Sequence, residues 1–427
     1  MSRLLRQFID IRKNELQPAL LFFSFWFLVI LVFQILKPLK KGMFVNSLGA
    51  YVELYAKLAN VAIAVLAVIC FTALYNRLGS RKLIGALCGF FTLALLVFAA
   101  LVAEKPSKAV NWSFYLFGDA WSTVWVTTFW AYLNELTETE QSKRLYGLIG
   151  GGGVVGGLLG GLVVWQLVRP LGAPALLISC AVVTLLVGAM VWRTESIAIQ
   201  PGSALRRRLA VAPAVPEKKS NAAMEGARLV MASKYLLAIT ATVFVYELVS
   251  QVLDYQYSTA AEALEGTGAT QAFFGQVTAI IGVVSVITQL FLVSFIIRRF
   301  SLTTALLVLP VAMAIASGVY LATPVLWAAA LLTISDNSFS YSINQTARET
   351  LFMPMSPDVK YKARAFANMF VQRLGKGVAI LTALVLAGVP MRFLSLVALL
   401  VIAIWCFLAI YAGRRFDVLT AAEAPAE

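Results

Sequence analysis

The hydrophobic positions of this chain fall into long runs, and each run is long enough to cross a membrane as a helix. About 20 mostly apolar residues span the hydrocarbon core of a bilayer. That length predicts twelve helices, at 18–37, 52–76, 83–103, 111–134, 146–168, 173–193, 235–260, 271–297, 301–322, 324–347, 366–388 and 391–412. The pattern therefore predicts an all-α membrane protein with twelve transmembrane helices.

A polar, basic stretch separates the sixth run from the seventh. It includes three consecutive arginines, Arg206–Arg208, and the pair Lys218 and Lys219. We expect an N-terminal six-helix bundle at 1–193, a cytoplasmic linker at 194–234, and a C-terminal six-helix bundle with a short cytoplasmic tail at 235–427. Two six-helix halves are typical of the major facilitator superfamily, whose halves alternate access to a site at the membrane midplane.

Composition agrees with this interpretation and argues against a soluble enzyme. The chain is 60% hydrophobic and 13% charged, against roughly 45–50% and about 25% in soluble domains. It contains no histidine, which removes histidine acid–base chemistry and most zinc sites. We expect no catalytic residues, no metal site and no cofactor.

The net charge of +14 reports mainly how the chain is oriented in the membrane. Most lysines and arginines fall on one side of the predicted helices, where cytoplasmic loops concentrate them. Those groups are the N-terminus, Arg77/Arg81/Lys82, Lys143/Arg144, the central linker, Arg298/Arg299, Lys360/Lys362/Arg364 and Arg414/Arg415. We expect a multi-pass protein of the bacterial inner membrane, monomeric, with both termini cytoplasmic and no nucleic-acid partner.

The loop after the second run resembles a major-facilitator signature, D-R-x-G-R-R/K. It reads Asn76-Arg77-Leu78-Gly79-Ser80-Arg81-Lys82, with Asn where that signature has Asp. Cations on a glycine turn can cap helix carboxyl ends and latch one conformation. Arg77, Arg81 and Lys82 are therefore gating candidates, with a plain positive-inside loop as the alternative.

Ionisable side chains inside the runs are candidate site residues because charge at membrane depth is costly. Lys37, Lys40 and Lys41 cluster at the outer end of the first run, around Pro38, which we expect to break or bend the helix. This cluster favours an anion site, although lysines can also snorkel to the interface. On the fourth helix Asp119 needs a cation, and these lysines are candidates for it.

Aromatic and amide side chains accompany that carboxylate along the fourth helix. Trp121, Trp125 and Trp130 lie near it, and Asn134 ends the helix. Tryptophans can stack on a flat ring, but packing or interfacial anchoring is the favoured interpretation.

The seventh helix carries one polar stripe. Glu247, Gln251, Asp254 and Ser258 recur at helical spacing, so they share a face. Two acids on one stripe indicate a face that interacts with cations, binds protons or takes part in gating. The alternative is contact between the two halves of the bundle.

The tenth helix is too polar to face lipid, so it must line a cavity or the core. Its polar run, between 335 and 349, includes Asn344 and also Arg348, whose guanidinium suits phosphate. On the eleventh helix Asn368, Gln372 and Lys376 recur every four residues. Cations and acids in both halves would suit a polyanion that opens internal ion pairs as it binds.

Glycines crowd the fifth helix, at 150–153, 156–157 and 160–161. No Lys-Ser/Thr follows them, so a phosphate loop is not indicated. Small residues every four positions allow helices to approach closely, and we expect a packing role.

Several segments carry motifs that occur together in one known family. Leu36-Lys37-Pro38-Leu39-Lys40 resembles an L-R-x-x-K-D element, and Phe129–Thr137 resembles F-W-x-x-x-N-Q-I-T. Ser142–Leu148 resembles A-K-R-F-Y-P-L, Arg348–Pro354 resembles K-E-M-A-Y-I-P, and Leu374-Gly375-Lys376 matches L-G-K. With these motifs the chain resembles the ATP/ADP translocase family, nucleotide transporters of plastids and intracellular bacteria. The similarity lies in patches over most of the helical region.

The resemblance implies a twelve-helix, major-facilitator-like fold that exchanges a nucleotide for another nucleotide or phosphate. Its four charged helix positions fall on Lys40, on Asp119 (Glu in the family), on Arg348 (Lys in the family), and near Ser250. The last is not an acid here, but Glu247 and Asp254 flank it.

The leading hypothesis is therefore a nucleotide carrier of the ATP/ADP type that works by alternating access. A proton-coupled carrier of another phosphorylated or organic anion, and a membrane scaffold or sensor that transports nothing, are the alternatives. The predicted binding set is Lys37, Lys40, Lys41, Asp119, Asn134, Asn344, Arg348 and Lys376. The predicted gating and ion-pair set is Glu247, Gln251, Asp254, Arg77, Arg81 and Lys82.

Overall fold

The computed structural model describes residues 13–104, 106–137, 139–198, 222–292, 296 and 299–423. Every regular element in these ranges is helical, which confirms the all-α prediction. The helices are α2 (Lys13–Leu48), α3 (Ala50–Ala103), α4 (Lys108–Leu136), α5 (Thr139–Ala198), α7 (Ala222–Ala232), α8 (Lys234–Ala261), α9 (Thr267–Ile287), α11 (Leu302–Ala322), α12 (Leu326–Phe339), α13 (Gln345–Thr350), α14 (Pro357–Ala365), α15 (Gln372–Val385) and α16 (Met391–Glu423). Arg3, Arg6, Arg12, Arg206–Arg208, Lys218, Lys219 and Arg298 lie outside the described residues.

Within the described ranges, nine helical segments are long and apolar enough to cross a membrane. One of them, Leu145–Arg193, has 49 residues. At 1.5 Å per residue it would measure about 74 Å, more than twice the roughly 30 Å of a hydrocarbon core. The chain is thus a multi-pass membrane protein, and the count of twelve stays a prediction.

Two glycines interrupt the longest helices where the sequence predicts loops. Gly79 in α3 has φ 70° and Gly172 in α5 has φ 78°. These values lie in the left-handed region, which glycine adopts without the steric cost of a Cβ. Each pair of predicted runs, 52–76 with 83–103 and 146–168 with 173–193, is therefore joined by a kink at one glycine.

Pro38 does not break the first helix. Helix α2 continues through it to Leu48, past the predicted end of the first run. A proline removes only one helical hydrogen bond, and helices in membranes tolerate it where neighbouring groups satisfy the freed carbonyl. Of the expected break or bend at Pro38, the break is wrong and the bend stays a prediction, and Lys40 and Lys41 lie on a continuous helix.

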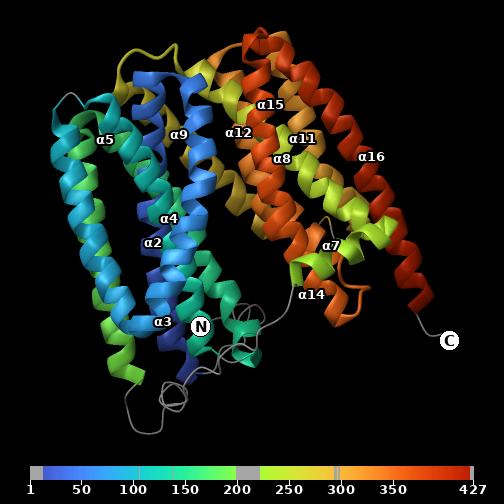
Figure 1. Cartoon of the computed structure of the whole chain (residues 1–427), viewed down its shortest axis with the longest axis horizontal. Helices are drawn as coiled ribbons and strands as arrows, with labels where there is room; N and C mark the ends of the chain where they lie inside the picture. Colours follow the sequence, from blue (N-terminus) through green and yellow to red (C-terminus); the bar gives the residue numbers. More distant parts are fainter. Residues whose placement is uncertain are drawn as a thin grey trace. The chain divides into compact units, whose positions relative to one another are not determined.

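The chain forms two compact units, and each is discontinuous in sequence. Unit 1 contains residues 1–48, 62–215 and 264–282, and unit 2 contains 49–61, 216–263 and 283–427. Figure 1 shows α2, α4 and α5 among the helices of unit 1, and α8, α11, α12, α15 and α16 among those of unit 2. The division at 1–193, 194–234 and 235–427 stays a prediction.

The glycines of α5 let it lie directly against α2 in unit 1. A Cβ added at Gly156 would lie 2.5 Å from the Phe27 carbonyl oxygen, and one at Gly160 would lie 2.8 Å from that of Leu31. Real Cβ atoms essentially never lie within 3.0 Å of such an atom, so a larger residue at either position would push the two helices apart. The predicted packing role of these glycines is confirmed.

In unit 2 the most polar segment lies in the protein interior. Helix α12 continues through a π-helical turn, η2 (Ser340–Asn344), into α13. Most of its polar side chains are buried, among them Ser335, Asp336, Ser338, Ser342 and Asn344. The prediction that this helix belongs to the core is confirmed, and the π turn re-aims the side chains that follow it.

Candidate functional site

In unit 1 the buried ammonium of Lys40 forms an ion pair with the Asp119 carboxylate, from α2 to α4. The same ammonium lies 4.4 Å from the ring centroid of Tyr115, within cation–π range. A Cβ at position 118 would lie 2.7 Å from Cδ of Lys40, so Gly118 makes room for the lysine chain. The expected pairing of Asp119 with a first-helix lysine is confirmed.

The neighbouring lysines of α2 differ from Lys40 in their surroundings. Lys37 and Lys41 are half-buried, and the Lys41 ammonium lies 5.5 Å from the ring centroid of Phe274 on α9. Beside them Gln271 donates a hydrogen bond to the Leu39 carbonyl oxygen at 3.0 Å. This segment of α2 therefore carries one buried lysine, Lys40, and two half-buried lysines, Lys37 and Lys41.

Asn134 lies in a different environment from Asp119, although both belong to α4. Its side chain is exposed and accepts a 2.5 Å hydrogen bond from the Tyr146 hydroxyl. Trp121 and Trp125 are fully buried in the core of unit 1, and Trp130 packs edge-on against Trp26 at 5.5 Å. The packing interpretation of these tryptophans is confirmed.

Unit 2 contains a second cluster of opposite charges, centred on the buried Glu247 of α8. Gln372 of α15 donates a 2.9 Å hydrogen bond to Glu247 Oε1. Lys376 and Arg348 both interact electrostatically with the same carboxylate. The structure thus brings one predicted gating acid together with two predicted phosphate-binding cations. Gly375 lets α15 lie close to α8 at this point, because a Cβ at position 375 would lie only 3.3 Å from the Cβ of Glu247.

The other acid of the α8 stripe has a partner that sequence reasoning missed. Lys57, in the part of α3 that belongs to unit 2, pairs with Asp254 at 2.5 Å and lies 3.9 Å from Glu53. The side chain of Glu53 is only 1% exposed and that of Lys57 only 10%. Both residues lie inside the predicted second helix, so their charge at membrane depth was the signal that could have found them.

Between these two acids, Ser250 donates a 2.5 Å hydrogen bond to Oδ2 of Asp336 on α12. Asp336 is buried. A carboxylate therefore lies beside Ser250, although position 250 is not itself an acid. Gln251, next on the stripe, is buried, and its Oε1 has no hydrogen-bond donor among the described residues.

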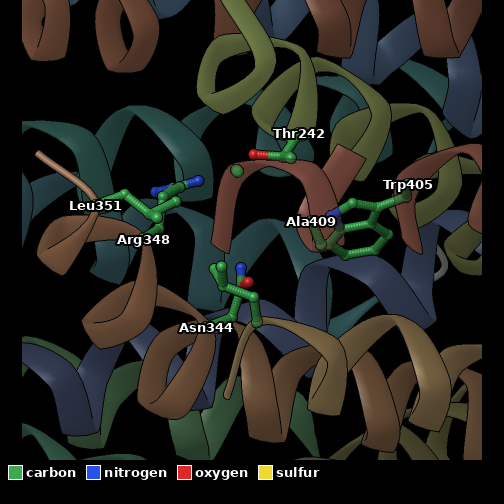
Figure 2. Close-up of a pocket in the computed structure, with 8 residues that line it drawn as sticks. Thr242, Asn344, Arg348, Leu351, Trp405 and Ala409 are labelled. Atoms are coloured by element: carbon green, nitrogen blue, oxygen red, sulfur yellow. The ribbon is translucent and has the colours of Figure 1, made fainter. Parts of the chain in front are cut away.

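Arg348 and Asn344 also line a small cavity inside unit 2. Figure 2 shows their side chains around it, together with Thr242 of α8 and Trp405 of α16. The cavity measures about 10 Å³, which is space for at most one water molecule. A phosphate group therefore needs side-chain movement before it can reach Arg348 from this side.

The predicted gating cations after the second run lie at the surface. Arg77 and Lys82 are exposed on either side of the Gly79 kink. The side chain of Arg81 lies outside the described part of the structure. These cations stay gating candidates by prediction alone.

Each unit thus contains a buried cation held by a carboxylate, Lys40 with Asp119 in unit 1 and Lys57 with Asp254 in unit 2. Near Glu247 of unit 2, Arg348 is half-buried and Lys376 is exposed. In the described part of the chain no three histidine, cysteine or acidic side chains cluster as metal ligands. A buried ammonium or guanidinium that must be paired can exchange its carboxylate for an anionic ligand. The arrangement can bind a multiply charged anion, and it can couple that binding to a change in its own ion pairs.

Comparison with known proteins identifies relatives along the whole chain. A family model described as the TLC ATP/ADP transporter matches residues 107–334, just over half of the chain. ADP,ATP carrier protein 1 of Chlamydia muridarum (strain MoPn / Nigg) is 24% identical, over 98% of this chain and 92% of the relative. ADP,ATP carrier protein 4 of Rickettsia felis (strain ATCC VR-1525 / URRWXCal2) is 22% identical, over 97% of this chain and 94% of the relative.

Solved transporter structures share the fold. The nucleoside transporter NupG matches with a TM-score of 0.59 at 12% identity, over 93% of this chain and 99% of NupG. The xylose transporter XylE of E. coli, in an inward-open conformation, matches with a TM-score of 0.58 at 12% identity, over 91% of this chain and 95% of XylE. At identities this low, the structural matches show a shared fold alone, and that fold is the one of the major-facilitator-like transporters.

Proposed function

The chain belongs to the TLC ATP/ADP transporter family, and from that premise we propose how it exchanges nucleotides across the membrane. The cations of the two charge clusters, around Asp119 and around Glu247, bind the nucleotide phosphates, and the carboxylates hold these cations between binding events. Exchange proceeds by alternating access, the mechanism of major-facilitator-like carriers.

One observation carries this proposal: the ion pair between the buried Lys40 and the partly exposed Asp119. An ammonium removed from water is stable only with a counter-ion, so a phosphate that approaches Lys40 competes with Asp119. Binding free energy is thereby linked to a change of pairing inside the protein. A ligand shifts a conformational equilibrium only through such differential interactions.

The second cluster repeats this logic with Glu247 as the carboxylate. Arg348 and Lys376 both interact with it, and a guanidinium can bind phosphate through two parallel hydrogen bonds. We assign phosphate binding to Lys37, Lys40, Lys41, Arg348 and Lys376, with Asp119, Asn134 and Asn344 as the polar members of the binding set. We assign gating to Glu247, Gln251, Asp254, Arg77, Arg81 and Lys82.

Orientation and assembly complete the proposal. The excess of Lys and Arg in one set of loops supports a cytoplasmic location for both termini and for the central linker. The bacterial origin of the ADP,ATP carrier relatives supports the inner membrane as its location. We further propose that the protein works as a monomer.

Exchange in proteoliposomes tests the function. Vesicles loaded with unlabelled ADP are expected to take up labelled ATP, and Lys40→Ala and Arg348→Ala are each expected to abolish that uptake. Arg414→Ala, which removes an exposed cation of α16, is the matched control and should leave uptake unchanged. Uptake that survives both substitutions overturns the residue assignment, and absence of uptake for every nucleotide overturns the substrate class.

A further inference from the structure

A second hollow in unit 2 lies on the side of α13 that carries Gln345 and Glu349. It has a volume of about 550 Å³, within the range of small-molecule sites. All but one of the side chains that line it come from three segments, and the exception is Met353 between α13 and α14. The others are Gln289 of η1 (Thr288–Leu292), Gln345, Thr346, Glu349 and Thr350 of α13, and Lys360 and Arg364 of α14. Its size and its polar lining distinguish it from the 10 Å³ cavity beside Arg348.

The charges around this hollow leave a surplus cation. Glu349 forms an ion pair with Arg364, which neutralises both groups. Lys360 is half-buried and forms no ion pair with any described residue. Apart from Met353, every side chain of the lining is polar or charged, so an apolar ligand such as a lipid tail is not favoured.

Arg364 adds an observation that points to a ligand. Its Nε is buried and has no hydrogen-bond acceptor among the described residues. A guanidinium presents two donor faces, and here Nη2 contacts Glu349 while the Nε–H stays unused. Buried donors in native proteins are nearly always satisfied, and the Nε face suits a phosphate oxygen.

We infer that this hollow binds a phosphate-bearing ligand through the Lys360 ammonium, with amide donors from Gln289 and Gln345. The buried Nε–H of Arg364 joins these donors once a shift of that side chain exposes it to the ligand. The ligand is either the phosphate of a soluble nucleotide or the headgroup of an anionic lipid. On the proposed topology α14 is cytoplasmic, so the site meets either ligand on the cytoplasmic side. It extends the proposed function, since it lies apart from the Arg348 cavity.

Binding of inorganic pyrophosphate to the purified full-length protein, measured by calorimetry in a neutral detergent, tests the inference. Lys360→Gln is expected to weaken binding about fivefold, the effect of one half-buried charge-assisted contact. Lys362→Gln is the matched control: it removes the same charge from the same helix, but Lys362 pairs with Glu225 outside the hollow. Arg364→Lys should also weaken binding, because lysine keeps the charge and lacks the second donor face.

The Arg348→Ala background separates this inference from the proposed function. That substitution is expected to abolish nucleotide exchange, while pyrophosphate binding that depends on Lys360 persists. Nanodiscs of phosphatidylcholine, alone or mixed with phosphatidylglycerol, then distinguish the two sources. Competition between phosphatidylglycerol and pyrophosphate identifies the lipid headgroup, and absence of competition identifies the soluble phosphate. Equal pyrophosphate affinity of Lys360→Gln and Lys362→Gln, with both proteins folded and monodisperse, overturns the inference.

Discussion

The buried charges of this protein are stable because each one lies beside an opposite charge or a hydrogen-bond donor. Lys40 lies against Asp119, Lys57 against Asp254, and Glu247 accepts a hydrogen bond from Gln372. An unpaired ion at such depth costs several kcal/mol. A substitution that removes one member therefore affects the free energy of unfolding as well as transport.

Lys40→Ala is expected to destabilise the protein and to abolish exchange. The Lys40 side chain is 6% exposed and that of Asp119 is 33% exposed. Breaking a fully buried pair costs about 3–5 kcal/mol, and partial exposure of Asp119 lowers our expectation to about 2 kcal/mol. The measurement is the thermal unfolding midpoint in detergent, with exchange assayed in parallel.

The double variant Lys40→Ala/Asp119→Ala separates these two effects. Removing the stranded carboxylate is expected to recover most of the lost stability, while exchange stays abolished. If the double variant unfolds at the same temperature as Lys40→Ala, the ion pair is not the source of the destabilisation.

At the scale of elements, close helix contact decides which residues are tolerated. Helix α5 lies on α2 through glycines whose added Cβ atoms would overlap backbone oxygens of α2. Lipid provides no hydrophobic force between helices, so van der Waals contact of this kind holds such helices together.

Gly160→Ala is expected to lower the free energy of unfolding by about 1–3 kcal/mol, the usual cost of overpacking. Gly150→Ala is the matched control, since a Cβ at Gly150 meets no atom within 4 Å. That change should be neutral or slightly stabilising because alanine favours the helix. Chemical unfolding in detergent measures both variants. Equal free energies of unfolding would show that α2 and α5 accommodate the added methyl group with no loss of stability.

At the scale of the whole molecule, the proposed mode of transport is exchange, in which entry of one nucleotide is tied to exit of another. The proposed function includes no coupled proton. Labelled ADP inside proteoliposomes is therefore expected to leave only when nucleotide is present outside.

The same assay tests the role of Asp254. Asp254→Asn leaves Lys57 without its closest carboxylate and should slow exchange without making it respond to an imposed pH gradient. Asp417→Asn, at an exposed position of α16, is the control and should behave like the unmodified protein. Uptake driven by a pH gradient and abolished by Asp254→Asn would instead establish proton symport.

Local patterns predicted much of this molecule. Apolar runs predicted the helices, the glycine at position 79 marked a break, and the polar run after residue 334 predicted a helix in the core. Periodicity also placed Glu247 and Asp254 on one face of α8. These features depend on spacing within one segment, which the sequence records directly.

The sequence by itself therefore determined the class of fold, the family resemblance and the residues that must be shielded or paired. Only the tertiary structure decided which partners meet: Lys57 with Asp254, 197 positions away, and Ser250 with Asp336, 86 positions away. It also decided that the start of α3 belongs to unit 2 and most of α9 to unit 1. The physical reason is that helical spacing fixes the face of a helix on which a side chain lies, whereas packing between distant helices selects what that face contacts.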